Sequence, residues 1–145
     1  MINKEEKVIL MYEDESFYIK EYIEKLEKMG YKVKVLDNAN DFLTYAKENY
    51  MNIDLYIIDI MVFGPGNEFD GRNTDGGARS GLVILDEIEK MEKEHPDTSP
   101  KKKIIFTNRK GPVFEEAKND KRISKAIHKS DVLPSEFVEI IKEAI

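Results

Sequence analysis

Short runs of apolar residues alternate along the chain with apolar residues at helical spacing. Ile19, Tyr22 and Leu26, for instance, recur every three or four positions, which favours an amphipathic helix. The alternation predicts five strands, at residues 7–12, 31–35, 53–60, 103–107 and 123–128. A helix is predicted after each strand, at residues 16–29, 42–50, 82–91, 113–118 and 133–145. Asn40 or Asp41 is expected to cap the second of these helices.

Strands that alternate with helices predict a parallel sheet with helices packed on both of its faces. The expected fold class is α/β, with a doubly wound five-stranded parallel sheet, and 145 residues suit one such domain. In sheets of this kind, ligands bind at the carboxyl ends of the strands. The candidate functional residues are therefore those that directly follow each predicted strand.

Polar residues stand at the ends of most of the predicted strands. Glu13 and Asp14 follow the first strand, and Asp59 lies at the end of the third. Thr107 ends the fourth, and Lys129 follows the fifth. Asp59 interrupts an apolar run, where an unpaired buried carboxylate would cost several kcal/mol. Taken alone, Asp59 could be solvated or could cap a turn. If the first and third strands are neighbours, the three carboxylates form an acidic cluster that favours a hard cation such as Mg²⁺.

The charge balance narrows the classes of ligand and partner. The chain has 23 Lys and Arg against 29 Asp and Glu, a formal net charge of −6. This balance, without a dense basic block, argues against a nucleic-acid partner and against binding to an anionic membrane. The absence of cysteine excludes thiolate nucleophiles and cysteine-ligated metals. No apolar stretch reaches membrane-spanning length, so we expect a cytoplasmic protein.

The polar residues at the strand ends match a known family in their order. Glu13-Asp14, Asp59, Thr107 and Lys129, in these elements, resemble the signature of the response-regulator receiver domain, the CheY-like domain of two-component signalling. The resemblance spans essentially the whole chain, residues 1–145. It implies a flavodoxin-like three-layer sandwich with strand order 2-1-3-4-5. It also implies a single-domain phosphorylation switch that signals through a partner, rather than an enzyme that acts on other substrates.

The resemblance implies a role for each of these residues. Asp59 is the implied phosphoacceptor, which takes a phosphoryl group from a histidine kinase or a phosphotransfer protein to give an acyl phosphate. The implied Mg²⁺ ligands are Glu13, Asp14, Asp59 and the backbone carbonyl of Met61. Lys129 and Mg²⁺ would neutralise the phosphoryl oxygens, and Thr107 would donate its hydroxyl to the new phosphate.

Several positions depart from the family pattern. Asn108 stands where a small residue usually follows the threonine, Ala126 replaces an aromatic switch residue, and Ser130 replaces a proline that commonly follows a cis bond. We expect a trans bond after Lys129, because a non-proline cis bond costs about 2.5–4 kcal/mol. Met61 lies where the family positions a hydrolytic water. Its side chain cannot hydrogen-bond that water, which predicts slow self-dephosphorylation.

A glycine-rich insertion at about residues 63–81 follows Asp59 and is longer than the usual receiver loop. It is either a flexible insertion or a lid or partner-docking loop over Asp59. Asp70 and Asp75 within it could reach a cation. A phosphate-cradling loop is not indicated, because the glycine-rich motif that ends in lysine and serine or threonine is missing.

Two other functions stay open at this point. A receiver-like adaptor that no longer uses phosphorylation is motivated by Asn108, Ala126, Ser130 and the insertion. A Mg²⁺-dependent phosphohydrolase resembling the haloacid-dehalogenase type would need two aspartates spaced D-x-D after the first strand, whereas Asp59 stands on the third strand. The intact acidic cluster and Lys129 favour the phosphorylation switch over both alternatives.

Overall fold

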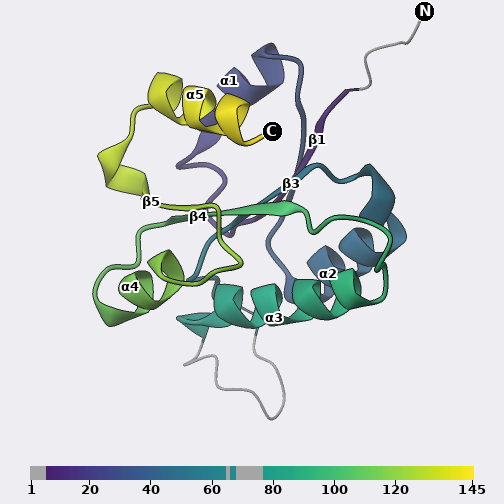
Figure 1. Ribbon diagram of the computed structural model, residues 1–145. Coiled ribbons are helices and arrows are strands. Elements are labelled where there is room, and N and C mark those ends of the chain that lie inside the picture. The colour runs from purple at the N-terminus through teal and green to yellow at the C-terminus, as the bar shows by residue number, and fades with distance from the viewer. Residues whose placement is uncertain (1–5, 65, 68–76) are drawn as a thin grey trace, which may run out of the picture.

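The computed structural model describes residues 6–64, 66–67 and 77–145. Its strands form one parallel sheet in the order β2-β1-β3-β4-β5 (Figure 1). They are β1 (Val8–Tyr12), β2 (Lys32–Leu36), β3 (Leu55–Ile58), β4 (Lys102–Thr107) and β5 (Lys125–His128). In β1, Tyr12 lies opposite Leu36 on one side and Ile58 on the other, so the residues that follow β1 and β3 are neighbours. The predicted sheet and its strand order are confirmed.

Helices cover both faces of the sheet and make a three-layer sandwich. The helices are α1 (Lys20–Lys28), α2 (Ala39–Glu48), α3 (Ser80–Lys93), α4 (Pro112–Lys118) and α5 (Pro134–Ala144). α1 and α5 lie on one face, and α2, α3 and α4 lie on the other (Figure 1). The 3-10 helix Tyr50–Asn52 lies before β3, and the 3-10 helix Lys129–Asp131 lies after β5. The flavodoxin-like architecture follows directly from the alternation of strands and helices.

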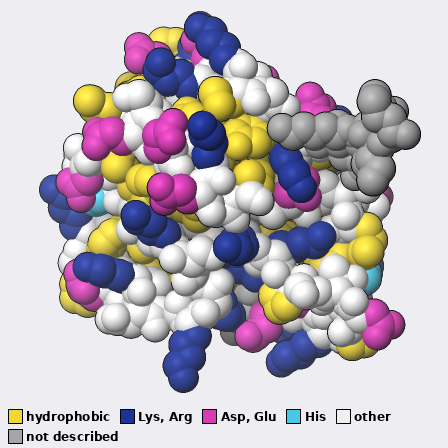
Figure 2. Space-filling model, turned by 45° about the horizontal axis from the view of Figure 1, so that its top comes forward, with side chains coloured by type: hydrophobic (Ala, Val, Ile, Leu, Met, Phe, Trp, Pro, Cys, Tyr) yellow, Lys and Arg dark blue, Asp and Glu magenta, His cyan; other side chains and the backbone are white. Residues whose placement is uncertain are grey.

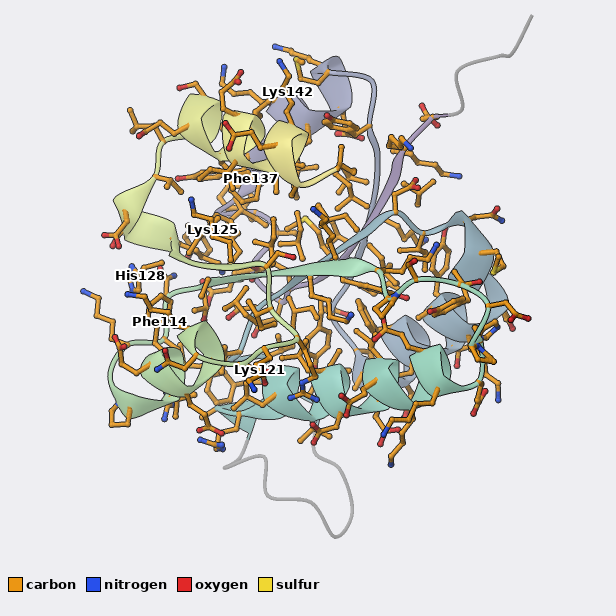
Figure 3. All side chains as sticks on the ribbon, viewed as in Figure 1. Phe114, Lys121, Lys125, His128, Phe137 and Lys142 are labelled. Carbon is orange, nitrogen blue, oxygen red and sulfur yellow. The ribbon has the colours of Figure 1, made fainter. Side chains whose placement is uncertain are left out.

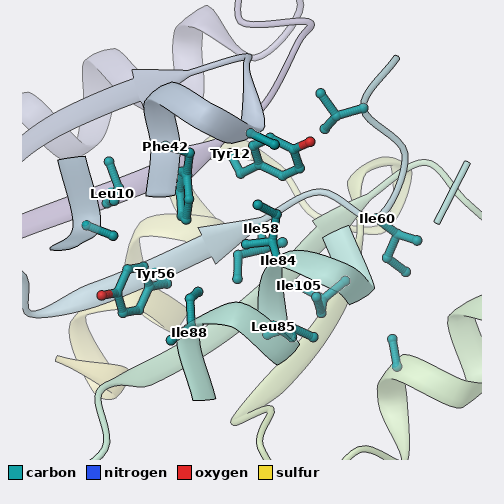
Figure 4. Close-up of a cluster of buried hydrophobic side chains, with 14 of the residues drawn as sticks. Leu10, Tyr12, Phe42, Tyr56, Ile58, Ile60, Ile84, Leu85, Ile88 and Ile105 are labelled. Carbon is teal, nitrogen blue, oxygen red and sulfur yellow. The ribbon is translucent and has the colours of Figure 1, made fainter. Parts of the chain in front are cut away.

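Each face of the sheet has its own apolar core, because successive side chains of a strand point to opposite faces. Between the sheet and the helices α2 and α3, Phe42, Tyr56 and Ile84 are fully buried (Figure 4). On the opposite face, Phe137 of α5 packs on Phe106 of β4, with 4.4 Å between the ring centroids. Each large apolar side chain buried in this way contributes roughly 1.5–3 kcal/mol. The two cores therefore hold the strand ends in fixed positions.

Several element boundaries differ from the prediction. α1 begins at residue 20 rather than 16, because residues 16–19 form turns without a side-chain cap. Phe17 and Tyr18 in these turns point to solvent, with exposed fractions of 80% and 77%. α2 is capped by Asn38, whose Oδ1 accepts a hydrogen bond from the Asp41 N–H at 3.1 Å. The prediction that Asn40 or Asp41 caps this helix was therefore wrong by two or three residues.

The lengths of the helices and the distribution of surface charge concern possible contacts with membranes and with other molecules. Within residues 6–64, 66–67 and 77–145, no helix is both long and apolar enough to span a lipid bilayer. On the face shown in Figure 2, acidic and basic side chains are intermixed rather than separated into regions of one sign.

A buried ion pair joins β4 to α3 near the amino end of the sheet. Lys103 Nζ lies 2.8 Å from Glu92 Oε2 and donates to the Lys101 carbonyl at 2.7 Å. The side chains of Lys103 and Glu92 are 2% and 10% exposed. We expect Lys103→Met to lower the free energy of unfolding by about 3–5 kcal/mol, because Glu92 would remain buried without its cation.

Urea denaturation measures the effect of Lys103→Met. Lys102→Met, at the neighbouring exposed position of β4, is the control and should change the free energy of unfolding by less than about 0.5 kcal/mol. Adding Glu92→Leu to Lys103→Met should recover most of the loss, because an apolar pair can replace a buried ion pair at little cost. Equal stability of the Lys102 and Lys103 variants would contradict the prediction.

Candidate functional site

The predicted strand-end residues meet at the carboxyl edge of the sheet. Glu13 follows β1, Asp59 follows β3, Thr107 ends β4 and Lys129 follows β5. They come together because β1, β3, β4 and β5 lie side by side in this order. All four side chains are buried, and that of Asp14, next to Glu13, is half-buried.

Both oxygens of the Asp59 carboxylate are contacted. Oδ1 accepts a hydrogen bond from Thr107 Oγ1 at 2.6 Å and from the Met61 N–H at 3.1 Å. Oδ2 lies 2.9 Å from Lys129 Nζ, and the same ammonium lies 2.8 Å from Glu13 Oε1. The peptide bond after Lys129 is trans, as expected. Lys129 and Thr107 therefore provide the partners that a carboxylate buried at the end of β3 needs.

Glu13, Asp14 and Asp59 form the predicted acidic cluster. One carboxylate oxygen of each residue lies within 4.8 Å of the others. Asp14 Oδ2 accepts a hydrogen bond from the Phe63 N–H at 3.2 Å, whereas Asp14 Oδ1 is buried without a hydrogen-bond partner among the described atoms. A buried acceptor that lacks a donor needs a cation or a water. Clustered carboxylate oxygens are the ligands that Mg²⁺ prefers, so the donor set fits this ion.

The electrostatics of the cluster agree with a cation site. Burial, and next the charge of Asp59, raise the pKa of Glu13 to about 8, although Lys129 opposes the rise. Burial lowers the pKa of Lys129, but its ion pairs with Asp59 and Glu13 more than offset this, and the pKa ends above its ordinary value. Glu13 and Asp59 thus share the ammonium of Lys129, and the carboxyl group of Asp14 lies beside them without contacting it. The excess of negative charge would be neutralised by a divalent cation.

The structure tests only part of the predictions for Met61, Asp70 and Asp75, the other residues expected around the site. The Met61 backbone lies at the site, since its N–H contacts Asp59, while its carbonyl as a metal ligand stays a prediction. Met61 Sδ lies 3.8 Å from Arg109 Nη1, and the Arg109 N–H donates to Thr107 Oγ1 at 3.1 Å. Asp70 and Asp75, the further candidate ligands, lie outside the described residues.

His128, for which the sequence pattern predicted no role, fixes the turn after β5. Its Nδ1 lies 2.6 Å from Ser130 Oγ, and its Nε2 lies 3.0 Å from the carbonyl oxygen of Asn108. The ring also meets Phe114 of α4 edge-on, with 6.2 Å between the centroids (Figure 3). His128 therefore ties the turn after β5 to the loop after β4. Its position at the end of a strand next to β4 is the signal that could have found it.

Tyr12 and Asn67 were also missed by the sequence pattern. The Tyr12 hydroxyl at the end of β1 donates a hydrogen bond to Asn67 Oδ1, and both side chains are buried. The two residues are 55 positions apart, so no periodicity connects them. The available signal was the tyrosine itself, because a phenol at the end of a buried strand usually has a polar partner.

Comparisons with known proteins find similar structures but no matching sequence. No protein-family profile matches the sequence, and no curated protein matches it. The chain is similar in structure to a CheY-like receiver domain protein from Methanospirillum hungatei JF-1, with 22% sequence identity, 96% of this chain and 93% of that chain covered, and a TM-score of 0.66. A response regulator from Thermotoga maritima gives 17% identity, coverage of 97% and 98%, and a TM-score of 0.66.

A third similar structure comes from a family of streptococcal redox sensors that evolved from two-component response regulators. It gives 20% identity, covers 95% of this chain and 50% of that chain, and has a TM-score of 0.67. These likenesses and the sheet order β2-β1-β3-β4-β5 show that the chain has the fold of the CheY-like response-regulator receiver domains.

Proposed function

We propose that this chain is a response-regulator receiver domain that accepts a phosphoryl group on Asp59. The observation that carries the proposal is the environment of the Asp59 carboxylate, which lies between the Thr107 hydroxyl at 2.6 Å and the Lys129 ammonium at 2.9 Å. Beside it lie the carboxyl groups of Glu13 and Asp14. Together these groups can supply a nucleophile, charge stabilisation and a hydrogen-bond donor, which phosphoryl transfer to a carboxylate requires.

In the proposed reaction, an oxygen of Asp59 attacks the phosphorus of a phosphohistidine on a histidine kinase or a phosphotransfer protein. The P–N bond breaks, the imidazole leaves with the electron pair, and an acyl phosphate forms on Asp59. Lys129 neutralises charge on the phosphoryl oxygens. The proposed Mg²⁺ ligands are Glu13, Asp14, Asp59 and the Met61 carbonyl. When bound, this ion would add positive charge next to the same oxygens.

The proposed product is a signal for a second protein. The Thr107 hydroxyl turns from Asp59 to the phosphoryl group, which shifts the loop after β4 and alters a docking surface for a downstream partner. The proposed protein catalyses only its own phosphorylation and dephosphorylation. We expect it to act in the cytoplasm as one domain over residues 1–145, without a nucleic-acid or membrane partner.

Intact-mass spectrometry after incubation with acetyl phosphate, with and without Mg²⁺, tests the proposal. We expect the wild-type chain to gain one phosphoryl group only when Mg²⁺ is present, and Asp59→Asn to gain none. Asp54→Asn is the matched control, because Asp54 lies at the opposite end of β3 and its carboxylate accepts the Val8 N–H. This variant should be phosphorylated like the wild type. A phosphoryl group that persists in Asp59→Asn would overturn the proposed acceptor.

A second candidate function, a receiver-like adaptor that works without phosphorylation, has one observation in its favour. The similar streptococcal protein belongs to a family of redox sensors that evolved from response regulators, so the fold serves a different signal there. The same experiment separates the two functions. A chain that binds Mg²⁺ but gains no phosphoryl group from acetyl phosphate or from a phosphohistidine donor would favour the adaptor.

The proposed acyl phosphate is expected to be long-lived, because the thioether of Met61 cannot orient a hydrolytic water. We expect Met61→Asn to shorten its half-life about tenfold, the factor that corresponds to about 1.4 kcal/mol from one new hydrogen bond in the transition state. Mass spectrometry after removal of the donor measures the half-life. Met61→Leu is the apolar control and should leave it unchanged. A wild-type half-life of only seconds would contradict this expectation.

A further inference from the structure

The first residues of the insertion are fastened to the fold by the buried side chain of Asn67. Its Oδ1 accepts hydrogen bonds from the Tyr12 hydroxyl and, at 2.8 Å, from the Ala39 N–H. Its Nδ2 donates to the carbonyls of Asp37 at 2.8 Å and Phe63 at 3.1 Å. Asn67 is 1% exposed. These four bonds use the full hydrogen-bonding capacity of a side-chain amide.

Asn67 thereby joins three elements beside the site: the end of β1, the first turn of α2 and the segment after β3. The Ala39 N–H belongs to the first turn of a helix, where backbone donors lack partners within the helix. The backbone of the insertion approaches this turn closely, because a Cβ on Gly66 would lie 2.1 Å from Asn38 Nδ2. Asn67 is therefore a packed part of the fold.

The far end of the insertion returns to the same place. The Val62 N–H donates to the Gly77 carbonyl at 3.1 Å, and Ser80 Oγ lies 3.0 Å from the carbonyl oxygens of both Val62 and Gly77, to either of which its single proton can be donated. A Cβ on Gly77 would lie 2.7 Å from the Val62 carbonyl oxygen. The two ends of the insertion thus pack directly on each other, and we call Val62, Phe63, Asn67, Gly77 and Ser80 the neck of the insertion.

The neck reaches the acidic cluster through the backbone of Phe63. The Phe63 N–H donates to Asp14 Oδ2 at 3.2 Å, and the Phe63 carbonyl accepts from Asn67 Nδ2. The other oxygen, Asp14 Oδ1, is the buried atom without a hydrogen-bond partner in the described part of the chain. Asp14 thus binds the N–H of Phe63, and Asn67 binds its carbonyl. The position of Asn67 therefore constrains the orientation of the Asp14 carboxylate.

We propose that Asn67 is a positioning residue for the cation site, which holds Phe63 against Asp14 and so leaves Asp14 Oδ1 available as a ligand. This inference rests on the proposed function. Hydrogen-bond partners behind a ligand orient it, and their loss typically lowers metal affinity about 10–100-fold. The neck of the insertion thus sets the affinity for Mg²⁺.

The test is a titration of the intact chain with Mg²⁺, followed by the amide NMR signals of the loops after β1 and β3. We expect Asn67→Ala to raise the Kd for Mg²⁺ about tenfold or more. Phosphoryl uptake from acetyl phosphate by Asn67→Ala should reach half of its maximal rate at a correspondingly higher Mg²⁺ concentration than in the wild type. Tyr12→Phe keeps the volume of the side chain and both Nδ2 bonds of Asn67, and should raise the Kd by a smaller factor.

Tyr56→Phe is the matched control for Tyr12→Phe. Tyr56 lies in the same apolar core, and its buried hydroxyl has no hydrogen-bond partner in the described residues, so this variant should keep the wild-type Kd. Thermal unfolding shows that each variant is folded at the temperature of the titration. If Asn67→Ala and Tyr12→Phe both keep the wild-type Kd for Mg²⁺, the inference about Asn67 is overturned and the proposed function is not. If Asn67→Ala does not fold, a wild-type Kd in Tyr12→Phe overturns the inference in the same way. A wild-type chain that binds no Mg²⁺ would overturn the proposed function as well.

Discussion

Gly81→Ala is expected to lower the free energy of unfolding by about 3 kcal/mol or more, even though alanine is the better helix former. Gly81 lies in the first turn of α3, and a Cβ there would be 2.1 Å from the Asp59 carbonyl oxygen and 2.8 Å from the Ile60 Cα. Both are backbone atoms, so neither can rotate away as a flexible side chain could. The Gly81 N–H also donates to the Ile60 carbonyl at 3.0 Å, which fixes the helix against the end of β3.

Urea denaturation followed by circular dichroism measures the loss in Gly81→Ala. Gly111→Ala is the control: Gly111 has a φ of +82°, and no described atom lies within 4 Å of a Cβ built on it. The control should lose less, about 1–3 kcal/mol, because with a ψ of −154° Gly111 lies in a backbone region that essentially only glycine adopts, but an added methyl group there meets no atom. Because Asp59 lies where α3 would be pushed away, phosphoryl uptake should fall as well. Unchanged stability of Gly81→Ala would show that α3 tolerates a methyl group at this contact.

Lys129→Met is expected to cause the second large loss in the free energy of unfolding, and the size of this loss should depend on pH. Loss of the cation leaves Glu13 and Asp59 buried beside each other, and removal of one partner from a buried ion pair costs about 3–5 kcal/mol. The pKa of Glu13, already raised to about 8, rises further without Lys129. A carboxyl group with a raised pKa stabilises the fold below its ordinary pKa and loses this contribution as the pH rises through the folded value. The stability of the variant should therefore fall as the pH rises from 4.5 past 8.

Urea denaturation on both sides of neutral pH measures this dependence for Lys129→Met. Lys125→Met, at the exposed start of β5 (Figure 3), is the control and should follow the wild type at every pH. Saturating Mg²⁺ should restore part of the lost stability at neutral pH, since a ligand that binds only the folded chain stabilises it. Phosphoryl uptake should be lost at all pH values. A pH dependence that matches Lys125→Met would show that Lys129 does not compensate the buried carboxylates.

The fold and most of the site geometry were predictable because both depend on short segments. The four strands that bear the site, β1, β3, β4 and β5, contain apolar runs that end in or are followed by a polar residue, and a parallel sheet brings such ends to one edge. Asp59, Thr107 and Lys129 could therefore be found without knowing any contact. The start of α1 was not predictable in this way: the helix was expected from residue 16, yet residues 16–19 form turns, and Phe17 and Tyr18 point to solvent.

Contacts between distant side chains were not predictable from local patterns. Asn67 lies in a glycine-rich segment whose composition suggests flexibility, yet it is almost fully buried. Its partners come from β1 and from the start of α2, and their placement depends on how the whole sheet is assembled. The cap of α2 is a similar case, because Asn38, Asn40 and Asp41 are all suitable residues and the path of the chain after β2 selects Asn38.

The lysines of β2 bear on the solubility of the protein. β2 is an edge strand of the sheet, and edge strands can template pairing with another chain. Lys32 and Lys34 are exposed and alternate along this edge. A second copy that added its own β2 here would bring like charges together, which is destabilising. These lysines therefore protect the open sheet against edge-to-edge aggregation, so replacing both with valine would be expected to make the protein aggregate at lower concentration.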